Sequence, residues 1–315
     1  MNKTIFKFFI FIFIFQAQLS YGCLNGETLV LKNGVLIYHD ENGENGIPIG
    51  RDFNKHDFEA IIKDLRKFYK ETNDIGYLSD VGVVLILQKK YKEAIQLYNE
   101  IEKTNPNRYS TASNLGTIYE LTGDNVNALK WIEKSLKINK DSHKHSEWIH
   151  VNILKAKVKG LIFSSQNIIN TDFSFESFPK TSLTKEELGF LRVEIYFQLN
   201  ERISFIKEKD KSIAVLLFDL ANIDYLLGKK SSQYKELYKM AVDYGFDKKF
   251  VEDRLKAIEK HELANKDIEK DVVSNEKNIS NSKKTKSEST SYIIYLSLSI
   301  VLLIILYFLF KKFKK

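Results

Sequence analysis

The residues of this chain that come nearest to a metal site are three histidines in the segment HKHSEWIH. Imidazoles bind one metal ion together only when their side chains reach the same point. His143 and His145 are two positions apart, so on a helix they would point to different sides, and His150 is expected to pack beside Trp148. The segment therefore predicts a loop followed by the start of a helix, and we predict no metal site.

Other patterns that would indicate catalysis or cofactor binding are incomplete. The segment HELAN comes near to the zinc-protease pattern HExxH, but Asn265 stands where the second histidine is required. No GxGxxG, GxxxxGK or GxSxG pattern occurs, and a single cysteine, Cys23, allows neither a CxxC pair nor an internal disulfide. We therefore predict no catalytic residue, no cofactor and no enzymatic activity.

The charge of the chain is concentrated at its two ends. The formal net charge is +7, and six lysines that contribute to it lie in residues 1–22 and 311–315, where no acidic residue occurs. The residues between are close to neutral, so they lack the basic surface with which nucleic-acid-binding proteins neutralise phosphates. We therefore predict no nucleic-acid partner, and the terminal lysines point instead to membrane topology.

Residues 1–22 have the features of a secretory signal peptide: a short basic start, an apolar stretch and small residues at the end. We expect cleavage just before Cys23. A lipoprotein signal places leucine three residues before the cysteine, whereas Leu19 lies four residues before Cys23. We therefore expect Cys23 to be the unmodified first residue of the mature protein.

The carboxyl-terminal end predicts a membrane anchor. Residues 292–310 contain no charge over nineteen positions, which is long enough for a helix to cross a bilayer, and four lysines follow in residues 311–315. Lysines next to a transmembrane helix stay on the cytoplasmic side. The polar residues 263–291 are expected to be a flexible linker. These features predict a single-pass inner-membrane protein with its body in the periplasm and its tail in the cytoplasm.

Two consecutive segments of the body, 75–108 and 109–142, repeat each other with an offset of 34 residues. The matching positions are Val81 with Leu115, Gly82 with Gly116, Leu85 with Tyr119, Ala94 with Ala128, and Tyr98 with Ile132. This pattern resembles the tetratricopeptide repeat, a helical hairpin that stacks into a solenoid. The small residues at four of these positions, Gly82, Ala94, Gly116 and Ala128, would let packed helices approach closely.

The flanking residues are expected to supply further helices, because two repeats alone cannot cover their open faces. We predict a helix that has Asn54 as its N-cap. A second predicted helix opens on a capping box formed by Thr184 and Glu187. Residues 214–246 are expected to form a degenerate third helical hairpin.

The fold class that follows is an all-α solenoid of the tetratricopeptide type over residues 53–262, with an irregular insert at 160–183. A small β-hairpin is expected within residues 23–52, around the turn signal Asn33-Gly34. The arrangement of the body also resembles a group of exported, membrane-anchored repeat proteins of Bacteroidetes.

The resemblance to tetratricopeptide repeats implies an inner groove lined by the first helix of each unit. The residues at those inward places are Ser79, Val83, Ile86, Ser113, Thr117 and Glu120. They are mostly small, polar or apolar, so we predict that they face solvent and that the groove binds a peptide segment of a protein partner in the envelope. The other possibility is that the protein's own flanking helices fill the groove, because solenoids need caps. The alternative is an envelope enzyme with an unrecognised active site near residues 160–183. No oligomeric state is predicted.

Overall fold

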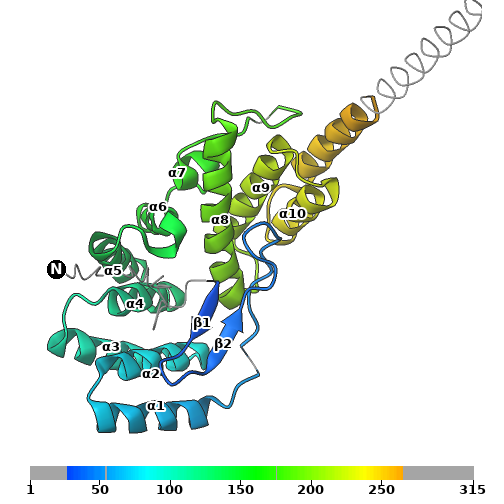
Figure 1. Cartoon of the computed structure of the whole chain (residues 1–315). Coiled ribbons are helices and arrows are strands. Elements are labelled where there is room, and N and C mark those ends of the chain that lie inside the picture. Colours follow the sequence, from blue (N-terminus) through cyan, green and yellow to red (C-terminus); the bar gives the residue numbers. More distant parts are fainter. Residues whose placement is uncertain (1–26, 54, 175, 265–315) are drawn as a thin grey trace, which may run out of the picture. The chain divides into compact units, whose positions relative to one another are not determined.

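The computed structural model describes residues 27–53, 55–174 and 176–264. Within these ranges the protein is mostly helical, with a two-stranded antiparallel sheet near the amino-terminal end (Figure 1). The prediction of a helical protein with a small β-hairpin is therefore confirmed. The chain divides into two units after residue 252, and the elements described below all belong to the first unit.

The predicted signal peptide, Cys23 and the apolar segment 292–310 lie outside the described residues, as does the predicted linker from residue 265 on. Residues 263 and 264, predicted to begin the linker, are helical. Within the described ranges, none of the helices combines the length and the apolar composition that crossing a bilayer requires. The anchor at 292–310 therefore stays a prediction from the sequence.

The amino-terminal hairpin consists of β1 (Thr28–Val30) and β2 (Leu36–His39), which pair antiparallel. The backbone N–H of Leu31 donates to the carbonyl of Val35 at 2.8 Å and closes the turn. Gly34 adopts a φ of +87°, which glycine reaches at little cost. The hairpin thus turns at the predicted Asn-Gly pair.

Helices α1 to α5 follow the hairpin, and each packs against the next in chain order. Their bounds are α1 Phe58–Thr72, α2 Ile75–Leu87, α3 Tyr91–Thr104, α4 Tyr109–Leu121 and α5 Asn125–Ile138. α4 and α5 begin and end 34 residues after α2 and α3, so the helix boundaries recur with the period of the sequence. The N-cap of α1 is Asp57, which accepts from the backbone N–H of Ala60 at 3.1 Å, and not the predicted Asn54.

The two helices of each repeated hairpin approach closely at a glycine. A Cβ atom on Gly82 of α2 would lie 2.4 Å from the Tyr98 ring of α3, and one on Gly116 of α4 would lie 2.4 Å from the Ile132 side chain of α5. Neither position has room for a side chain unless its neighbour moves. The fully buried alanines of the second helices are Ala94 and Ala128.

The third unit, which follows α5 and precedes the predicted hairpin at 214–246, departs from the repeat. α6 (Glu147–Lys159) has thirteen residues, like α4, but begins 38 residues after it. The extra positions correspond to the 3-10 turn η1 (Ser142–His145), in which His143 and Lys144 have left-handed φ values of 52° and 53°. α7 (Ser165–Ile169) has five residues, where the second helices α3 and α5 have fourteen. The predicted insert at 160–183 therefore contains a shortened second helix.

The elements that follow are α8 (Lys185–Phe205), α9 (Lys211–Leu226) and α10 (Ser231–Asp243). α8 opens on the predicted capping box of Thr184 and Glu187. α9 and α10 pack against each other, and the hydroxyl of Tyr238 in α10 donates to Oδ1 of Asn222 in α9 at 2.6 Å. The predicted degenerate hairpin at 214–246 is thus formed by α9 and α10.

Candidate functional site

The six residues predicted to line an open peptide groove are buried. The exposed fractions lie between 0 and 8 % for Ser79, Val83, Ile86, Ser113, Thr117 and the side chain of Glu120. The expectation that these residues face solvent is therefore wrong. An external peptide could reach them only after displacing other parts of the chain.

The amino-terminal hairpin and the end of α8 lie against these positions. Leu29 and Leu31 of the hairpin belong to the same apolar core as Val83 and Ile86, and Phe205 at the end of α8 packs against that core. These residues are far apart in the sequence, so no local pattern indicated the contact. The inner face of the repeated helices is thus occupied by the protein itself.

Polar contacts hold the hairpin turn against the first helices. The backbone N–H of Lys32 donates to Oδ2 of Asp80 in α2 at 2.5 Å, and the amide of Asn33 donates to Asp64 in α1 at 2.9 Å. Burial raises the pKa of Asp80 to about 7, although the hydrogen bond from Lys32 opposes the shift. The second oxygen of Asp80, Oδ1, has no hydrogen-bond partner among the described residues.

The segment that follows the hairpin is fastened along α8. Asn200 of α8 accepts from the backbone N–H of Gly50 and donates to Asp40, both at 2.9 Å. Tyr196 also donates to Asp40, at 2.7 Å, and Ser204 accepts from the backbone N–H of Arg51 at 2.9 Å. Residues 40–51 therefore connect the hairpin to a helix far along the chain, since Gly50 and Asn200 are 150 positions apart.

A set of largely buried charged residues lies where α4, α6 and α8 meet. We call it the charged cluster, and its members are Glu120, His143, Glu147, His150, Lys157, Glu201 and Arg202. Glu120 accepts from Nε2 of His150 at 2.6 Å, Nζ of Lys157 at 2.7 Å and Nη1 of Arg202 at 3.0 Å. Burial by itself would raise the pKa of Glu120, but Arg202, His150 and Lys157 hold that pKa well below its usual range.

Glu147, the first residue of α6, is a second buried carboxylate of the charged cluster. It contacts Nδ1 of His143, and Nε2 of the same imidazole lies 2.6 Å from the hydroxyl of Tyr109. Burial opposes ionisation of Glu147, but the neighbouring His143 keeps its pKa below the usual value. Glu201 differs, because burial raises its pKa. The cluster therefore contains carboxyl groups whose pKa values are shifted in opposite directions.

Sequence reasoning missed the charged cluster. The predicted loop and helix start are present as η1 and α6, but the contact that holds His150 is a hydrogen bond to Glu120, which the sequence did not indicate. Glu120 was the indication of the charged cluster in the sequence, because it places a carboxylate at a position predicted to lie on the inner surface. Within the described residues, no group of three or more His, Cys, Asp or Glu side chains is placed to hold a metal ion.

The charged cluster connects helices and does not enclose a pocket of ligand size. The space between Glu120, His150 and Arg202 measures about 20 Å³, which has room for a water molecule. Pockets for drug-sized ligands are at least ten times larger, roughly 300 Å³ or more. Because basic side chains from α6 and α8 already bind Glu120, the arrangement links three helices through one carboxylate.

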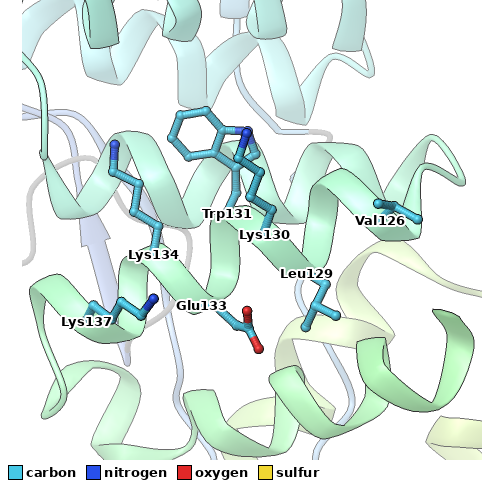
Figure 2. A pocket seen from close by; sticks show the side chains of 7 residues that line it. All are labelled: Val126, Leu129, Lys130, Trp131, Glu133, Lys134 and Lys137. Atoms are coloured by element: carbon cyan, nitrogen blue, oxygen red, sulfur yellow. The ribbon is translucent and has the colours of Figure 1, made fainter. Parts of the chain in front are cut away.

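A larger hollow lies on the outward side of α5, and we call it the α5 hollow. The residues that line it are Val126, Leu129, Lys130, Trp131, Glu133, Lys134 and Lys137. Figure 2 shows Lys130, Trp131 and Lys134 directed to one side of the helix and Leu129 and Glu133 to the other. The α5 hollow therefore combines apolar side chains with three lysines and one glutamate, a composition suited to a charged, partly apolar ligand.

Residues 81–156, from α2 to α6, match the model of a family described as a domain of unknown function (DUF6340). No curated protein and no solved structure matches the chain. The matched segment includes the repeated glycines Gly82 and Gly116 and four members of the charged cluster, namely Glu120, His143, Glu147 and His150.

Proposed function

We propose that this protein is an interaction scaffold of the tetratricopeptide type, held at the inner membrane with its body in the periplasm. The observation that carries the proposal is the recurrence of helix boundaries at 34 residues from α2 and α3 to α4 and α5. The repeated close approach at Gly82 and Gly116 supports it. Stacked helical hairpins of this kind present extended surfaces to other proteins. The signal peptide and the apolar segment 292–310 predicted from the sequence support the location.

The burial of the inner groove supports a partner surface on the outside of the helices. Val83 and Ile86 of the predicted groove share an apolar core with the hairpin and with Phe205 of α8, and Glu120 binds Arg202 of α8. Binding in the groove would first require these contacts to break. Binding at the α5 hollow, where lysines are exposed, needs no such rearrangement. The scaffold is therefore proposed to bind through its outer surface.

The experiment that tests the scaffold is purification of the full chain from membranes solubilised in mild detergent, after chemical crosslinking in the cell. We expect a protein partner to be recovered in a constant ratio to the chain. Recovery of the chain alone would contradict the scaffold. If the purified chain alone then converted a small molecule and lost this activity in Ser165→Ala, the result would favour an enzyme at the 160–183 insert, where Ser165 donates to Asp219 at 2.7 Å.

The location is tested separately with reporter fusions. A reporter that is active only in the cytoplasm should work when it is fused after Lys315 and should fail when it is inserted near Ser282. Replacing the four lysines of residues 311–315 should weaken this orientation, because the lysine bias helps to set it. Activity of the Ser282 insertion in the cytoplasm would contradict the periplasmic location.

A further inference from the structure

The row of second helices ends early at α5. α3 is followed in this row by α5, and Glu102 of α3 forms an ion pair with Lys134 of α5. The corresponding helix of the third unit is reduced to the five residues of α7. At matching repeat positions, Leu97 of α3 is buried, whereas Trp131 of α5 stays half-buried. At this position α5 is therefore covered less completely than the second helix before it.

The charges at the α5 hollow favour an acidic ligand. Lys134 pairs with Glu102, and Glu133 pairs with Lys155 at 3.6 Å, so these charges are neutralised within the protein. Lys130 and Lys137 are exposed and form no ion pair with a described residue. They are seven residues apart, which places them on the same side of α5 two turns apart.

Apolar side chains lie beside these two lysines. Val126 is 67 % exposed at the start of α5, and Leu129 and Trp131 are half-buried within the α5 hollow. A helix that packs along another helix offers a stripe of apolar side chains with charged side chains at its borders. α5 has fourteen residues, so a partner helix of three to four turns, about 20 Å long, would match it.

We propose that the α5 hollow binds an acidic amphipathic helix of a partner protein. Carboxylates seven residues apart on the partner meet Lys130 and Lys137, and its apolar side chains lie on Leu129 and Trp131. This assignment rests on the proposed scaffold function and specifies the partner class and the binding surface.

Two other occupants fit the α5 hollow less well. In a two-fold dimer through antiparallel α5 helices, Lys130 of one copy would face Lys137 of the other, which brings like charges together. An anionic membrane surface would attract the lysines but is flat, whereas Leu129 and Trp131 lie inside a hollow. A helix can enter the hollow and satisfy both kinds of side chain.

The test uses the full chain in a zwitterionic detergent and two fluorescent, helix-stabilised peptides of about sixteen residues, a length of about 24 Å. Both peptides carry leucines at alternating three- and four-residue spacing. One has glutamates seven residues apart and the other has lysines at those places. Fluorescence anisotropy measures binding. We expect the acidic peptide to bind about tenfold more tightly than the basic one, with an affinity that falls as salt is added.

The double variant Lys130→Glu with Lys137→Glu should weaken binding of the acidic peptide about tenfold and favour the basic peptide. A matched control is Lys63→Glu with Lys70→Glu on α1, which reverses two exposed lysines with the same seven-residue spacing. The control should leave binding unchanged, and neither double variant should shift the unfolding temperature.

Equal binding of the two peptides, an equal loss in the control variant, or no binding would overturn the assignment. Loss of phosphatidylglycerol-vesicle binding in the Lys130 and Lys137 variant, without a preference between the peptides, would assign the lysines to a membrane surface instead. The crosslinked purification separates this result from the scaffold proposal. If the double variant still recovers the partner, the scaffold stands and the α5 hollow is not its site.

Discussion

Asp80 is a carboxyl group that the fold keeps from water between α2 and the hairpin turn. The backbone N–H of Lys32 satisfies one oxygen, and the other oxygen has no partner among the described residues. Glu120 is buried too, yet it accepts from three basic side chains. The pKa of buried Asp80 is therefore raised and the pKa of buried Glu120 is lowered, because only Glu120 is surrounded by compensating charges.

The first prediction concerns the pH dependence of stability at Asp80. Its pKa in the folded protein is about 7, above the ordinary value of 3.8 for this side chain, so the folded state binds the proton more tightly than the unfolded state. The resulting cost of ionisation is absent below about pH 4 and grows, as the pH rises to 7, to at most about 4 kcal/mol. Asp80→Asn removes this cost and should raise the unfolding temperature at pH 8 but not at pH 4.

Asp74 provides the matched control for Asp80→Asn. The hydrogen bond from the side chain of Lys32 lowers the pKa of Asp74, which is more exposed than Asp80. The stabilising effect of this bond is present at pH 8 and is lost as the pH falls through the lowered pKa. Asp74→Asn should therefore lower the unfolding temperature slightly at pH 8. An unfolding temperature of Asp80→Asn that followed the wild-type pH profile would contradict the buried-carboxyl account.

The second prediction concerns the charged cluster. Glu120→Gln would leave Arg202, Lys157 and His150 without their shared carboxylate, and breaking a buried pair in this way costs roughly 3 to 5 kcal/mol. Glu133→Gln is the control, because its ion pair with Lys155 is about 40 % exposed on both sides and should contribute less than about 1 kcal/mol. Chemical denaturation of both variants measures the difference. Similar losses in the two variants would contradict a buried, structural role for Glu120.

At the scale of elements, the repeated hairpins are defined by the distance between their two helices. Gly82 and Gly116 occupy the closest points, and their neighbours Tyr98 and Ile132 differ in shape but fill the same place. Gly189 lies in the helix α8 as well, but a Cβ there would meet nothing within 4 Å. Glycine in a helix is therefore required by packing at two of these positions and not at the third.

The third prediction follows from this contrast. Gly116→Ala should destabilise the protein by about 1 to 3 kcal/mol, because the new methyl group overlaps Ile132. Gly189→Ala should stabilise it by about 0.5 to 1 kcal/mol, because alanine is the better helix former where space is free. Thermal and denaturant unfolding of the two variants checks the opposite signs. A Gly116→Ala variant as stable as the wild type would mean that the packing at Gly116 adapts to the methyl group, and a destabilised Gly189→Ala would contradict the free space at Gly189.

On the scale of the whole described unit, the chain covers its own inner groove. The hairpin packs on α1 and α2, and the segment 40–51 fastens to α8. α8 is also tied to α4 through Arg202 and Glu120. The first and the later helices are thus connected through contacts between distant parts of the sequence, and the groove residues belong to the core.

The fourth prediction tests this closure. The double variant Val83→Glu with Thr117→Glu places two carboxylates at positions that are 0 % and 7 % exposed, so burial of unpaired charge should destabilise the protein by more than about 4 kcal/mol. Its unfolding temperature should fall at least as far as that of Gly116→Leu. A double variant that unfolds like the wild type would show that these positions are open to solvent.

The sequence by itself determined the local structure and its period. The 34-residue offset, the Asn33-Gly34 turn and the Thr184 capping box all depend on residues close together in the chain, and each has its expected counterpart in the structure. Their physical causes are local: backbone freedom of glycine, side-chain caps, and small residues at the contact of adjacent helices.

Only the tertiary structure decided which surfaces remain open. The inner groove is filled because Asp80 meets Lys32 and Glu120 meets Arg202, partners that lie 48 and 82 positions away. Helical periodicity predicts that Val83 and Thr117 point inward, but it does not predict which segment of the chain packs against them. Burial depends on contacts between distant segments, and such contacts leave no periodic signal in the sequence.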